Sequence, residues 1–128
     1  MKEPAGYTME GVHVTYRPIG SITFDEAVAR VRSAITLACS TKAKDLLVDT
    51  TTWTGFSAPD TFQRFLAAVA WAEEAGGRLR LAMVAREEMI DRERFGVMVA
   101  KNRGLVSNIF TSEEEARAWL QEKRDSSQ

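Results

Sequence analysis

Apolar residues recur along the chain with two alternating periods. Val12, Val14 and Tyr16 alternate with polar residues, and this period of two is typical of a half-buried strand. Other apolar runs have the length and the branched side chains of buried strands. The pattern therefore predicts further strands at residues 7–10, 45–50, 78–85 and 106–110.

The segments between these strands carry apolar residues at spacings of three and four, which is typical of amphipathic helices. Thr23 or Ser21 is expected to cap the first helix, and Glu26, three residues after Thr23, supplies the second half of a capping box. Ser57 is the expected start of the second helix, because Pro59 suits a first helical turn. The predicted helices run from about 24 to 40, 57 to 75, 91 to 103 and 112 to 121.

The second predicted helix has apolar residues on two faces. The stripe that we expect to be buried consists of Phe62, Phe65, Leu66, Val69 and Ala72. Trp71 lies about 180° around the helix from Phe62 at roughly 100° per residue. We therefore expect Trp71 on the outer face, where it is either covered by another element or forms a contact surface for a partner.

Strands that alternate with helices predict an α/β fold with a mostly parallel sheet. A first strand that is joined to the next by a tight turn would make one edge of this sheet antiparallel. The 128 residues are expected to form a single domain, 1–128, with its core at about 8–121. The polar C-terminal tail, 122–128, is expected to fray.

Composition and charge narrow the function classes. A net charge of −1 gives no general attraction to nucleic acid. The single cysteine, Cys39, argues against disulfides and cysteine-rich metal sites. The single histidine, His13, argues against zinc enzymes and is expected to be solvated. We expect no metal and no cofactor. Without a signal peptide or a long apolar run, we expect a cytoplasmic protein and no membrane insertion.

The functional hypothesis rests on residues 44–61, where a buried strand leads through a polar loop into a helix start. Open α/β sheets carry their binding loops at such places. Asp49 either bonds loop amides or holds a cation, and Ser57 either caps the helix or belongs to an anion site. The loop aromatic residues either fold over the sheet edge or form a binding surface. With Trp71, the candidate binding residues are Asp49, Thr50, Thr51, Thr52, Trp53, Thr54, Phe56 and Ser57.

Several segments, taken in their order, carry a resemblance to a known family. They are residues 20–23, 46–49, 80–85, 95–96 and 109–120. In this order they resemble the STAS domain, in particular the stand-alone SpoIIAA-like branch, which is similar to anti-sigma-factor antagonists. The resemblance implies a four- to five-stranded sheet with helices packed mainly on one face, and a regulatory role in protein interaction or ligand sensing.

The resemblance fails at one functional position. In the antagonists, a serine at the start of the second helix is phosphorylated, and the matching position here is Ala58. The resemblance therefore implies a module without the usual serine phospho-switch, unless Ser57 or Thr61 substitutes.

These observations lead to competing functional hypotheses. The first is a non-catalytic module that acts through contact with a protein partner or as a homodimer, using residues 50–61 and the second helix. The alternative is binding of a small apolar, lipid-like or anionic ligand between residues 53–56 and the third helix, which a pocket beside Trp53 would favour. An enzyme built on Asp49 ranks last, because no pair of base and nucleophile can be named.

Overall fold

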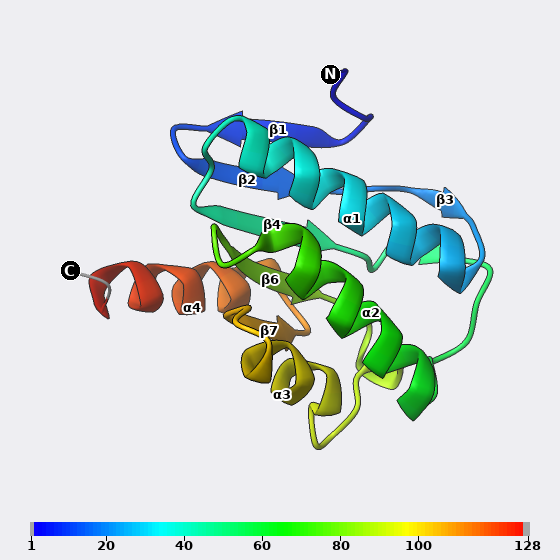
Figure 1. Cartoon of the computed structure of the whole chain (residues 1–128). Helices are drawn as coiled ribbons and strands as arrows, with labels where there is room; N and C mark the ends of the chain where they lie inside the picture. The colour runs from blue at the N-terminus through cyan, green and yellow to red at the C-terminus, as the bar shows by residue number, and fades with distance from the viewer. Residues whose placement is uncertain (1, 127–128) are drawn as a thin grey trace.

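The computed structural model describes residues 2–126 and contains a five-stranded sheet in the order β1-β2-β4-β6-β7 (Figure 1). Its strands are β1 (Tyr7–Glu10), β2 (His13–Tyr16), β4 (Asp45–Asp49), β6 (Arg80–Val84) and β7 (Ser107–Phe110). β1 is antiparallel to β2, and the other neighbouring strands are parallel. The predicted α/β fold with a mixed, mostly parallel sheet is confirmed.

Helices lie on both faces of this sheet, but not in equal number. Within the described residues the helices are α1 (Phe24–Ser40), α2 (Thr61–Ala75), α3 (Phe95–Asn102) and α4 (Glu113–Ser126). The larger apolar core lies where α1, α2 and α3 cover one face. A smaller core lies under α4 on the opposite face, where Ala116 and Leu120 meet Leu47 of β4. β4 is therefore buried from both sides.

A second, two-stranded sheet that the sequence did not predict fixes the loop after β4. In it, β3 (Gly20–Ser21) pairs in parallel with β5 (Trp53–Thr54). The next residue, Gly55, has a φ of +102°, and a Cβ atom there would lie 2.5 Å from the carbonyl oxygen of Ile22. Only glycine suits that conformation and that space. The loop is thus held against the segment that precedes α1.

The predicted boundaries need three corrections. The core begins before residue 8, because Tyr7 is buried, and α4 continues through 122–126 of the predicted tail; residues 127–128 of that tail lie outside the described residues. α3 begins at Phe95 rather than near residue 91. The segment before it forms a short 3-10 turn, η1 (Glu87–Met89), and Arg94 takes a left-handed conformation with a φ of 49°.

α2 begins at Thr61 rather than at Ser57, and its cap is Asp60. The Asp60 carboxylate accepts a hydrogen bond of 2.8 Å from the Gln63 N–H, and the Gln63 side chain accepts one of 2.9 Å from the Asp60 N–H. These two bonds form a capping box. The exposed Ser57 precedes the helix and does not cap it, so the predicted capping role of this serine is wrong.

The buried face of α2 also differs from the prediction. It consists of Ala67, Ala68, Ala72 and Ala75, so only Ala72 of the predicted stripe is fully buried. Phe62 is 67% exposed and Leu66 is 50% exposed. Of the two interpretations of Trp71, the structure bears out coverage by another element, because its indole N–H donates a 3.1 Å hydrogen bond to the Val28 carbonyl oxygen of α1. The spacing of apolar residues did not identify the buried face of α2, because this helix carries apolar residues on both faces.

The capping assignment leads to a first prediction. Asp60→Ala is expected to lower the free energy of unfolding by about 0.5–2 kcal/mol, since the first-turn N–H groups lose their acceptor. The matched variant Ser57→Ala is expected to leave the urea midpoint unchanged. A larger loss in Ser57→Ala than in Asp60→Ala would contradict the assignment.

Candidate functional site

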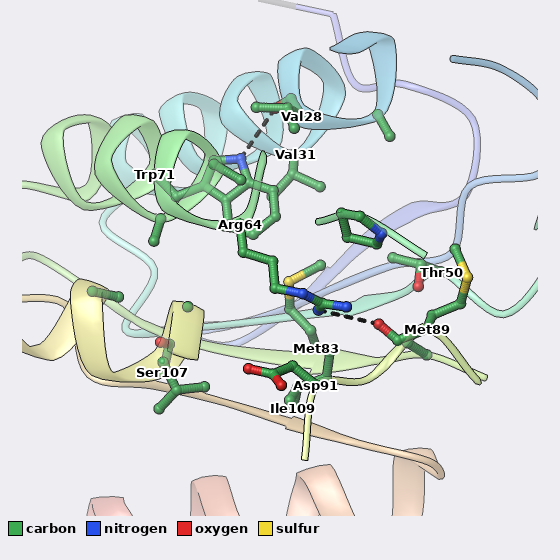
Figure 2. A pocket seen from close by; sticks show the side chains of 18 of the residues that line it. Val28, Val31, Thr50, Arg64, Trp71, Met83, Met89, Asp91, Ser107 and Ile109 are labelled. Carbon is green, nitrogen blue, oxygen red and sulfur yellow. Dashed lines mark hydrogen bonds between the residues drawn. The ribbon is translucent and has the colours of Figure 1, made fainter. Parts of the chain in front are cut away.

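A cavity of about 150 Å³ lies between the sheet and the helices α1, α2 and α3 (Figure 2). Its apolar walls include Val28 and Val31 of α1, Trp71 of α2, Met83 of β6 and Ile109 of β7. An apolar cavity of roughly 150 Å³ is able to hold a benzene-sized molecule. The location is the carboxyl end of the parallel strands β4 and β6, where the loop 50–56 and the segment 86–94 both leave the sheet.

The cavity exists because small residues face it from two helices. Ala67 and Ala68 of α2 and Gly96 and Ala100 of α3 all belong to its lining. A Cβ atom on Gly96 would lie 3.8 Å from the backbone oxygen of Arg64, so α2 and α3 approach each other closely there. These residues have small side chains or none, so they leave space between the two helices and the sheet.

Trp53 is the most unusual residue of the lining. Its side chain is 2% exposed and lies edge-on to Tyr16, with ring centroids 6.5 Å apart. Among the described residues, its indole N–H finds no hydrogen-bond acceptor. Buried N–H groups without a partner are rare in proteins. This N–H group has almost no accessible surface, so it is buried within the wall of the cavity, whereas other atoms of Trp53 line the cavity.

Charged residues line the cavity where the segment 86–94 covers it. Arg86 donates to the backbone oxygens of Thr51 at 3.3 Å and Trp53 at 3.1 Å, and it forms a 3.2 Å ion pair with Glu88. Arg86 therefore fixes the loop that carries Trp53. Arg64, Asp91 and Arg94 complete the charged lining.

The structure separates the predicted site residues into two groups. Four of them line the cavity, namely Thr50, Trp53, Phe56 and Trp71. The others do not, namely Asp49, Thr51, Thr52, Thr54 and Ser57. Asp49 accepts hydrogen bonds from the N–H and the hydroxyl of Thr51, at 3.0 and 2.7 Å. It therefore bonds the loop, as one of the two interpretations expected.

One group of lining residues that sequence reasoning missed comes from the segment after β6. Met89, Asp91 and Arg94 belong to it. One signal was present in the sequence. Loops that follow adjacent parallel strands meet at the same sheet edge, so the loop after β6 belongs beside the loop after β4. Arg64 had no such signal, because its position depends on the true orientation of α2.

The opposite face of the sheet carries a network of paired charges around a buried carboxylate. Asp45, which is 1% exposed, accepts hydrogen bonds from His13 Nδ1 at 2.8 Å, from Arg80 Nε at 2.9 Å and from Arg124 Nη1. The prediction that His13 is solvated is therefore only partly right. Its side chain is 42% exposed, but its Nδ1 also bonds the buried Asp45. An open groove of about 380 Å³ borders this network. The basic side chains that line this groove already pair with Asp45 or Glu113.

None of the protein-family models, curated proteins and solved structures compared with the chain matches it. Among residues 2–126, no helix has both the length and the apolar character that crossing a membrane requires. The same residues contain no cluster of three or more histidine, cysteine or acidic side chains suited to a metal ion. The interpretation of the site therefore rests on its own geometry.

The buried carboxylate gives a prediction about stability. Asp45→Ala is expected to lower the free energy of unfolding by about 1–3 kcal/mol, because the buried acceptor of the hydrogen bonds from His13, Arg80 and Arg124 is lost. Chemical denaturation of this variant and of the surface control Asp125→Ala measures the difference. Equal midpoints for both variants would show that the network does not stabilise the fold.

A second pair on this face predicts a pH dependence. Arg17 donates to both carboxylate oxygens of Glu113 at 2.8 Å and holds the pKa of that carboxyl at about 2, against an ordinary 4.5. A lowered pKa adds stability that is complete above about pH 4.5 and is lost as the pH falls towards 2. Glu113→Gln is therefore expected to weaken the acid dependence of unfolding in this window, with Glu114→Gln as the control. An unchanged acid limb in Glu113→Gln would be inconsistent with the pair.

Proposed function

We propose that the protein is a non-catalytic binding module that holds a small, mainly apolar ligand in the cavity beneath α1, α2 and α3. The observation that carries this proposal is a mainly apolar cavity of about 150 Å³ whose lining includes the aromatic rings of Trp53 and Trp71 and the charged side chain of Arg64. Ligand sites in proteins are largely apolar and contain a few placed polar groups that orient the ligand. The cavity has this composition.

The fixed position of the walls supports the same proposal. Trp71 joins α2 to α1 through its hydrogen bond to Val28, and an ion pair of 2.8 Å between Arg32 and Glu74 joins the same helices. Arg86 holds the loop that carries Trp53. A cavity whose walls are held by such bonds loses little conformational freedom when a ligand enters, and binding is stronger for that reason.

Protein contact is the second candidate function, and the outer face of α2 favours it. Phe62 and Leu66 leave an apolar stripe in solvent there, in place of the Trp71 surface that the sequence suggested. Exposed apolar patches often mark contact sites. A STAS-like regulatory module without the usual serine switch remains our proposal for this role, with α2 as the element that meets its partner.

The ligand proposal is tested with a neutral probe of the right size, phenylacetamide. Titration followed by NMR is expected to shift the indole N–H signals of Trp53 and Trp71, which line the cavity. Trp119 provides an internal control, because it contacts the smaller core on the opposite face. Absence of a shift at Trp53 and Trp71 up to the solubility limit of the probe would refute cavity binding.

A cavity-filling variant gives an independent prediction. Ala68→Leu is expected to reduce the affinity for phenylacetamide by about tenfold or more without lowering the melting temperature, since the added atoms occupy existing space. Ala70→Leu is the matched control, because Ala70 lies on α2 outside the lining. Unaltered affinity in Ala68→Leu would place the probe elsewhere.

A further inference from the structure

The second feature of the cavity is an arginine without a carboxylate partner. Arg64 extends from α2 over the cavity, and its Nη1 donates a 3.3 Å hydrogen bond to the carbonyl oxygen of Met89 (Figure 2). Its side chain is half-buried. In residues 2–126, no acidic group forms an ion pair with it. This guanidinium thus has one neutral hydrogen-bond acceptor, and the nearby charge of Asp91 interacts with it without forming an ion pair.

The acid that lines the same cavity is already engaged. Asp91 accepts backbone N–H groups from Phe95 at 2.9 Å and from Glu93 at 3.4 Å. The hydrogen bond from Phe95 lowers the pKa of Asp91. This carboxylate therefore accepts the first N–H of α3, whose N-cap residue is Arg94. Arg86 has Glu88 as its partner, and Arg94 is exposed and donates to the Ile109 carbonyl oxygen. Arg64 is the lining cation best placed to receive a new anion.

Charge and solvent exposure favour an anionic ligand group at Arg64. The lining holds three arginines and one aspartate, so it is net positive. A positive charge that is partly removed from water gains most from an anion that reaches it. A carboxylate can accept two hydrogen bonds from one guanidinium, which the single Met89 carbonyl cannot match in geometry or charge.

We propose that the ligand is a small organic monoanion, in which a carboxylate binds Arg64 in place of the Met89 carbonyl and a ring or short acyl chain occupies the apolar cavity. This inference rests on the proposed function and adds the chemical class of the ligand. The volume of about 150 Å³ limits the apolar part to about the size of a benzene ring.

The experiment compares carboxylates with amides of nearly the same shape. Phenylacetate and hexanoate are titrated against phenylacetamide and hexanamide, with the Arg64 Nε–H and Trp53 indole signals as the readout. The carboxylates are expected to bind about tenfold more tightly or better, as a charge-assisted hydrogen bond allows. The Arg64 Nε–H signal is expected to shift with the carboxylates only.

Variants of the arginine separate its role from the fold. Arg64→Gln is expected to abolish the preference for the carboxylates while it still binds both amides, which shows that the cavity is intact. Arg64→Lys keeps the charge and is expected to retain part of the preference. Arg92→Gln is the control, because Arg92 is exposed and lies outside the lining; it is expected to retain the full preference.

The outcomes distinguish the two proposals. Equal affinity of the wild-type protein for acids and amides would overturn the anionic class and leave cavity binding in place. A preference that survives Arg64→Gln would also overturn the role of this residue. If none of the four compounds binds, both the ligand class and the proposed function fail.

Discussion

The alanine face of α2 is the constraint on which the cavity depends. Ala67 and Ala68 reach the sheet with methyl groups alone, whereas the large residues Phe62 and Leu66 lie outside. Protein interiors normally leave few voids larger than a water molecule. A ligand that fills this space would stabilise the folded state through its binding free energy.

Most of the fold could be predicted from the sequence, because β4 and β6 are mainly apolar runs and β2 alternates apolar with polar residues. The apolar run at 45–50 was enough to predict β4. The capping box of Thr23 and Glu26 was enough to predict the start of α1, and neither prediction needed tertiary information. Two-residue strands such as β3 and β5 carry no period, so their pairing could not be predicted. It is tertiary structure that forms them, through Gly55 and its contact with Ile22.

The site was harder to predict than the fold because it depends on the orientation of one helix. α2 has apolar residues on nearly all sides, and an amphipathic argument assigns the larger ones to the core. The structure buries the alanines instead, which moves Trp71 inward and brings Arg64 over the cavity. The sequence also pointed to the loop after β4, part of which lines the cavity. Only Thr50, Trp53 and Phe56 of it reach the cavity, since Thr51 and Thr52 bond backbone and side-chain oxygens nearby.

The arginines on the two faces of the sheet differ in solvent exposure and in their partners. This difference determines where an anionic ligand would gain the most binding free energy. On the α4 face, Arg17 and Arg117 share Glu113, and half of each side chain is open to water. Exposed ion pairs contribute little, because solvent screens both partners. Arg64 lies among apolar side chains and has a neutral carbonyl as its acceptor. Electrostatic attraction is stronger in such surroundings than in water. The cavity beneath α1, α2 and α3 is therefore the place in this fold where a single negative charge would change binding most.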